Sequence, residues 1–190
     1  PASFVVFAVK ERTCKSKHLQ IVSSVSPYLY WIATYSWDMT MYLFLVAFIL
    51  MTLYAYGQEA SQIFIDNTEA LGAMTLLLIT YGSSALPLSY LYSFMYTNHS
   101  TAQISVMTIN FITGFVAVFA YYAMANIPST KNLAEQLVHL FRIWPPYNVG
   151  EGLLNITSTY FMNTILDKNI HYLSWEVTGR NIIYMAGETG

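Results

Sequence analysis

The stretch MTMYLFLVAFILMTLYAY, residues 39–56, decides the fold of this chain. It lies in a run from 39 to 58 without Asp, Glu, Lys or Arg, and two longer runs of this kind follow at 70–99 and 100–130. Because a helix rises ~1.5 Å per residue, about 20 apolar residues cross the ~30 Å hydrocarbon layer of a membrane. Each run reaches that length. The predicted spans are 37–57, 70–96 and 101–126.

The composition excludes an ordinary soluble domain. Hydrophobic residues make up 55% of the chain and charged residues only 9%, whereas soluble domains carry roughly 25% charged residues. The alternative, three helices buried in a soluble protein, needs more covering protein than 190 residues supply. A net charge of −2 provides no basic surface for nucleic acid. The sequence therefore predicts an all-α, polytopic membrane bundle.

The segments around the spans complete the predicted organisation. Residues 1–9 are predicted to end one span and 178–190 to begin another, so we expect the chain to be a fragment cut within membrane helices. Residues 10–36 form a polar loop, in which Pro27 is expected to break a helix. Residues 131–170 contain two short helices around a Pro-Pro turn. These two helices fit either a re-entrant hairpin or a pair lying on the membrane surface.

Basic residues orient the bundle. Four of the Lys and Arg residues lie in the 10–36 loop, whereas 57–69 is acidic. The positive-inside rule therefore places 10–36 in the cytosol and both 57–69 and 127–177 outside. Under this orientation the sequon at Asn98 stays unmodified in the cytosol. Asn155 faces outside and is a candidate glycosylation site, the alternative being that it lies too close to lipid to be used.

No catalytic, cofactor-binding or metal-binding pattern is present in the sequence. It contains no Gly-rich phosphate loop and no paired ligand motif, and its four histidines lie at predicted membrane edges. Within the predicted spans the acidic residues are Asp38, at an entry point, and Glu188. Intramembrane charges usually mark ion pathways, so their scarcity argues against a proton pump or voltage sensor. Asn110, Thr113 and Gly114 predict a close helix contact.

Several motifs, in order along almost the whole chain, resemble one known family. They are PASFVVF (1–7), KER (10–12), KSKHLQIVSSVSPYLYW (15–31), WDM (37–39), YG (81–82) with Pro87 and SF (93–94), STA (100–102), WPP with GEGL (144–153), and WEVTGRN with MAGE (175–188). Together they resemble the second transmembrane domain of ABC transporters of the A subfamily. Glu151 stands where that family usually has Arg, which leaves the choice of lipid open.

The resemblance implies a membrane half of an ATP-driven lipid transporter. It also implies a cytosolic coupling helix within residues 10–30 and extracellular-side, re-entrant helices at 131–170 that dip into the outer leaflet. ATP and Mg²⁺ would bind to nucleotide-binding domains outside this chain. The implied partners are a nucleotide-binding domain, the other transmembrane half of the same polypeptide, and membrane lipid as substrate. The residues implied to contact the nucleotide-binding domain are Lys10, Glu11, Arg12, Lys15, Lys17 and His18. The alternative role for these basic side chains is to bind anionic lipid headgroups.

Candidates for the lipid path are Tyr42, Phe44, Asn110 and Phe111, chosen because they lie on spans. Other readings remain at this stage. One is a channel or receptor fragment with an unrelated helical bundle, and another is an intramembrane enzyme, which would need paired catalytic residues within the spans. An ABC exporter of the G type would carry its ATP-binding domain before the spans. We expect an integral, multi-pass protein of the plasma membrane or of an organelle.

Overall fold

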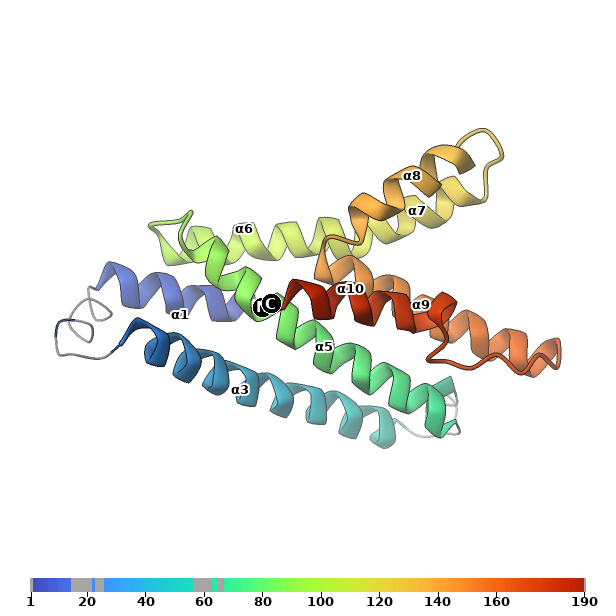
Figure 1. The fold of residues 1–190 in the computed structure, drawn as a ribbon, viewed down its shortest axis with the longest axis horizontal. Helices are drawn as coiled ribbons and strands as arrows, with labels where there is room; N and C mark the ends of the chain where they lie inside the picture. Colours follow the sequence, from blue (N-terminus) through green and yellow to red (C-terminus); the bar gives the residue numbers. More distant parts are fainter. Residues whose placement is uncertain (1, 15–21, 23–25, 57–62, 65–66, 190) are drawn as a thin grey trace.

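A computed structural model describes residues 2–14, 22, 26–56, 63–64 and 67–189, and Figure 1 gives its arrangement. All regular elements within the described residues are helical. The helices are α1 (Ala2–Thr13), α3 (Pro27–Ala55), α5 (Thr68–Ser93), α6 (His99–Phe111), α7 (Ala117–Ala125), α8 (Lys131–Phe141), α9 (Pro145–Ile165) and α10 (Arg180–Glu188), with π-helical turns η1 (Ile112–Val116) and η2 (Trp175–Gly179).

Three helices of the described chain are long and apolar enough to cross a membrane. They are α3, α5 and the continuous helix formed by α6, η1 and α7. The end of α1, the start of α3 and the α5–α6 turn lie at one end of the bundle, on the left of Figure 1. The end of α3, the start of α5, the α7–α8 turn and the end of α9 lie at the other. This grouping is the one that alternating spans require; which end faces the cytosol remains a prediction.

The first span begins ten residues earlier than predicted. Helix α3 starts at Pro27, so the prediction that 27–36 belongs to a loop is wrong. Ser26 caps the helix, because its side-chain Oγ accepts a hydrogen bond of 3.3 Å from the backbone N–H of Leu29. A proline in the first turn has no N–H that needs a partner and has a φ suited to the helix. Pro27 therefore starts the helix that follows it, which is compatible with the predicted break before it.

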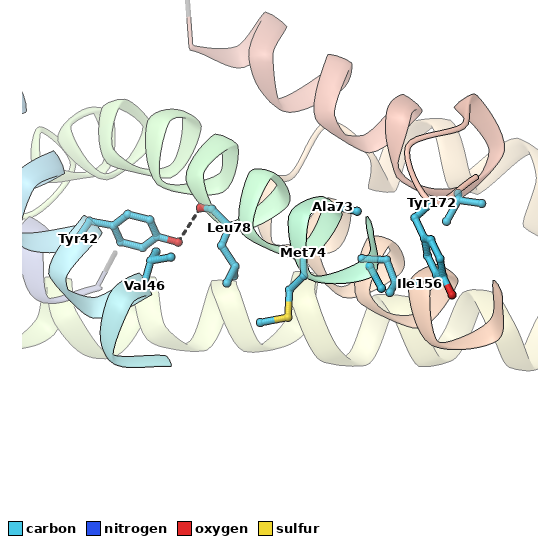
Figure 2. Close-up of a cluster of buried hydrophobic side chains, with 9 residues drawn as sticks. Tyr42, Val46, Ala73, Met74, Leu78, Ile156 and Tyr172 are labelled. Atoms are coloured by element: carbon cyan, nitrogen blue, oxygen red, sulfur yellow. Dashed lines mark hydrogen bonds between the residues drawn. The ribbon is translucent and has the colours of Figure 1, made fainter. Parts of the chain in front are cut away.

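Helix α5 forms the centre of the bundle. Its apolar segment is 44% buried, compared with 17% for α3 and 11% for α6–α7. Figure 2 shows the core cluster in which α5 packs against α3 on one side and α9 on the other. Gly82 allows the closest approach, because a Cβ there would lie 2.2 Å from the Tyr42 ring. The Tyr42 hydroxyl donates a hydrogen bond of 2.8 Å to the Leu78 carbonyl.

Helices α8 and α9 form a hairpin that packs deep against the spans. Figure 1 shows α8 running back beside α7 and α9 returning outward beside α5. A Cβ on Gly114 would lie 3.0 Å from Pro146, in the first turn of α9. One on Gly150 would lie 2.8 Å from the Gly114 carbonyl oxygen. Gly114 precedes the end of its span by 11 residues, or roughly 16 Å. This depth favours the re-entrant arrangement over a pair of surface helices.

Candidate functional site

A buried ion pair closes the turn of the α8–α9 hairpin. Arg142 follows the last residue of α8, and Glu151 lies on the second turn of α9. The guanidinium donates two hydrogen bonds to the carboxylate, from Nε to Oε2 at 3.0 Å and from Nη2 to Oε1 at 2.8 Å. Their side chains are only 4% and 2% exposed. Paired hydrogen bonds of this kind fix the direction of both side chains as well as their separation.

Three further side chains complete this polar cluster. On α10, Arg180 donates from Nη2 to Glu151 Oε1 at 3.2 Å, and Asn181 donates to Oε2 at 2.7 Å. On α9, the Asn148 amide donates to the Arg142 carbonyl at 2.7 Å. Glu151 therefore accepts four hydrogen bonds and joins the end of α8, the start of α9 and the start of α10. We call these five residues the hairpin cluster.

The hairpin cluster lies at the depth of the spans. Gly150 and Gly152, on either side of Glu151, are in close contact with the spans: a Cβ on Gly152 would lie 2.7 Å from Leu77, near the middle of α5. A charge at such a depth is costly unless it is paired. The packing of the hairpin against the spans favours the re-entrant arrangement over the surface pair, and the position of Arg142 and Glu151 within a membrane stays a prediction. The feature of the sequence that could have indicated this ion pair is the position of Arg142 and Glu151 on either side of the Pro-Pro turn, between two apolar helix faces.

The surroundings of Glu151 explain why an acid stands at this position. Two guanidinium groups and one side-chain amide are directed at its carboxylate. An arginine at 151 would put a third cation into this enclosed space, with no carboxylate among the cluster residues to balance it. The acid at this position is therefore matched to the arginines at 142 and 180.

Two of the residues predicted to contact a nucleotide-binding domain, Glu11 and Arg12, form hydrogen bonds within the chain. Glu11 accepts a hydrogen bond of 2.5 Å from the Tyr30 hydroxyl. Arg12 donates to the Tyr96 carbonyl, and its guanidinium lies 5.9 Å from the centre of the Phe94 ring. These contacts hold the end of α1 against the start of α3 and the α5–α6 turn.

Lys10 is exposed on α1, and Lys15, Lys17 and His18 lie outside the described residues. Contact of these residues with a nucleotide-binding domain therefore remains a prediction.

The candidate lipid-path residues do not share one surface. Tyr42 is only 5% exposed and belongs to the core between α3 and α5, so the structure gives it a packing role. Phe44 is 67% exposed on α3, and Phe111 is 58% exposed on α6. Asn110, next to Phe111, is half-buried.

The structure argues against glycosylation of Asn155. This residue lies within α9 rather than in a loop. Its carbonyl oxygen accepts a hydrogen bond of 2.8 Å from the Tyr122 hydroxyl, and its amide nitrogen donates one of 2.9 Å to the Val177 carbonyl. Both ends of the side chain are thus used inside the fold, and modification of Asn155 stays an untested prediction.

Asp38 is a second buried acid, between α3 and α5. It is eleven residues into α3 and 5% exposed, and its Oδ2 accepts a hydrogen bond of 2.6 Å from the Tyr90 hydroxyl on α5. Tyr90 is three residues before the end of α5, so Asp38 lies near one end of the spans, and its predicted position at the membrane entry stays a prediction.

Comparison with known proteins finds relatives in the family that the sequence motifs resemble, and the matches cover nearly the whole chain. The model of the ABC-2 family transporter protein matches residues 1–189. The chain is 32% identical over 197 residues to ATP-binding cassette sub-family A member 2 of Homo sapiens, and 33% identical over 196 residues to sub-family A member 7 of Rattus norvegicus. It is 28% identical over 196 residues to the retinal-specific phospholipid-transporting ATPase ABCA4 of Bos taurus. These matches cover 99% of this chain but only 8–9% of each relative.

Proposed function

This chain belongs to the ABC-2 family of transporter proteins, and we propose that it is the second membrane half of an ATP-driven lipid transporter. It is an integral membrane domain with a role in transport. The lipid substrate and the coupling to ATP are the proposed parts. The observation that carries them is the match along the full chain to sub-family A proteins, one of which is named a phospholipid-transporting ATPase.

The surface of the bundle supports an apolar or amphipathic cargo. Helices α3 and α6–α7 expose large side chains along most of their length, including Phe44, Phe48, Phe111 and Phe115 at 67%, 66%, 58% and 53%. Such faces suit lipid chains or a second membrane half. The ion pair of Arg142 and Glu151 is enclosed, whereas a chain of proton-exchanging groups would have to continue across the membrane.

Coupling is proposed to run through the cytosolic end of the bundle. ATP and Mg²⁺ would bind to nucleotide-binding domains that are separate from this chain. Their closure would move the segment between α1 and α3, and the contacts of Glu11 and Arg12 would pass that movement to α3 and to the α5–α6 turn. Rigid-body shifts of packed helices are a common way for such domain closure to be transmitted.

The full-length transporter in lipid vesicles tests this function. We expect phospholipid to stimulate its ATPase activity and a fluorescent phospholipid to cross the bilayer only when ATP is present. A Lys15→Glu, Lys17→Glu double variant should lose most of the stimulation, because both changes reverse charge in the segment proposed to be moved. Absence of any lipid-stimulated ATPase activity in the wild-type protein would overturn the proposal, and full stimulation in the double variant would overturn the coupling role.

A further inference from the structure

The hairpin cluster carries more positive than negative charge. Its ionisable residues are two arginines and one glutamate. Arg142 and Glu151 are matched by two short hydrogen bonds. Arg180 makes a single, longer hydrogen bond of 3.2 Å to Glu151, and its Nε is buried without a partner. Most of the donor capacity of Arg180 is therefore unused.

Arg180 is also the member of the cluster that can be reached from outside. Its side chain is 24% exposed, compared with 4% for Arg142 and 2% for Glu151. Ile183, on the same side of α10 three residues later, is 58% exposed. Glu176, one turn before Arg180, forms no ion pair with it among the described residues. A guanidinium with unused hydrogen-bond donors thus lies partly exposed beside the hairpin turn.

We propose that Arg180 binds the phosphate of a phospholipid while that lipid crosses the membrane. This inference rests on the proposed function. In a resting bilayer the phosphates lie beyond a ~30 Å hydrocarbon layer, about 15 Å from its middle. Only a headgroup that has left the surface can reach a side chain at the depth of the hairpin turn. The planar, always charged guanidinium matches the oxygens of a phosphate, which makes phosphate the ligand that fits best.

Glu151 keeps other hydrogen-bond donors when Arg180 leaves it for a phosphate. When Arg180 turns toward a phosphate, Glu151 keeps its two hydrogen bonds from Arg142 and the one from Asn181. The carboxylate then remains neutralised by one guanidinium, and the phosphate balances the other. Glu151 thus holds Arg180 in place between transport events.

Two lipids with the same acyl chains separate phosphate recognition from general lipid binding. Phosphatidylcholine contains the phosphate and diacylglycerol lacks it. In the full-length transporter, Arg180→Gln should raise the phosphatidylcholine concentration needed for half-maximal ATPase stimulation about tenfold, as expected for loss of a charge-assisted hydrogen bond. The response to diacylglycerol should stay unchanged. Lys168→Gln removes the same charge from an exposed loop position and should leave both responses as in the wild type.

Arg180→Lys keeps the charge that Glu151 needs and removes only the planar fork, so it tests the proposal even if the glutamine variant does not fold. It should weaken the phosphatidylcholine response several-fold. An unchanged phosphatidylcholine response in a folded variant overturns the role of Arg180, as does an equal loss for both lipids. Reduced thermal stability with an unchanged phosphatidylcholine response would also overturn it, and would identify a protein carboxylate as the partner. If the wild type responds to neither lipid, the proposed function fails and this inference with it.

Discussion

Two glutamates in this chain are held in opposite ways. Glu151, at the turn of the hairpin, is enclosed and accepts four hydrogen bonds, three of them from arginines. Glu11, at the end of α1, is half-buried and accepts one hydrogen bond from the neutral Tyr30 hydroxyl. The first arrangement fixes three helix ends to one another. The second arrangement leaves the Glu11 carboxyl with a single hydrogen bond. It lies at the end of the bundle that is proposed to receive the movement of the nucleotide-binding domains.

Glu151→Leu should break the deep site with the largest effect. It leaves two arginines without their carboxylate, and loss of one partner of a buried pair costs about 3–5 kcal/mol. We expect a clearly lower midpoint of thermal unfolding in detergent and a smaller monodisperse fraction of the intact protein. The triple variant Arg142→Met, Glu151→Leu, Arg180→Met should recover part of the loss because no charge remains unpaired. A single variant as stable as the wild type would contradict the enclosed cluster.

Asp38 provides an intermediate case. It is buried, as Arg142 and Glu151 are, but its hydrogen bond comes from the neutral Tyr90 hydroxyl. Tyr90→Phe leaves that carboxylate without its donor, which should cost about 1–3 kcal/mol. Thermal unfolding measures the change. An effect equal to that of Glu151→Leu would show that burial alone, and not the charge of the partner, decides how strongly an acid is held.

Gly150→Ala tests how closely the hairpin sits against the spans. The added Cβ would lie 2.8 Å from the Gly114 carbonyl oxygen and 2.9 Å from Val118. A backbone oxygen cannot move aside as the end of a side chain can, so overpacking should cost about 1–3 kcal/mol. Gly72→Ala, where nothing lies within 4 Å of the new carbon, is the matched control and should not lower stability. Equal stability of the two variants would mean that the hairpin lies further from the span.

Tyr30→Phe should have the smallest effect on stability and a visible effect on activity. The hydrogen bond to Glu11 is at a partly exposed site. We therefore expect the free energy of unfolding to fall by less than about 0.5 kcal/mol, seen as a small shift of the thermal unfolding midpoint. Lipid-stimulated ATPase activity should fall, because the link between α1 and α3 is weaker. A loss of stability as large as that of Tyr90→Phe would contradict the weak holding of Glu11. Unchanged lipid stimulation of the ATPase would contradict the role of this hydrogen bond in coupling.

The spans were predictable because they depend on local composition. Three charge-free runs are visible in the sequence, and the structure places long apolar helices over all of them. The predicted start of the first span differed from the start of α3 for a local reason. A proline such as Pro27 is compatible with the end of one helix and with the start of the next. The cap formed by Ser26 determines that a helix starts there. The bounds at such positions depend on a single hydrogen bond.

The hairpin cluster was not predictable in the same way, because its residues meet only in three dimensions. Arg142 and Glu151 are nine positions apart, but Arg180 is 29 positions beyond Glu151. Their meeting depends on the depth of the hairpin, which the sequence left open. That depth is set by the small residues Gly114, Gly150 and Gly152, of which only Gly114 had been singled out as a close contact.

Nitroxide labels on the hairpin of the intact protein measure its depth directly. The two sites are position 143, at the turn, and position 165, at the end of α9, where Ile143 and Ile165 are 56% and 73% exposed. Because α9 is 21 residues long, the label at 143 should lie about 15 Å or more deeper than the label at 165, accessible to oxygen and shielded from a water-soluble nickel complex. Equal depth at the two positions, both at the membrane surface, would contradict the re-entrant hairpin and the buried charge cluster that depends on it.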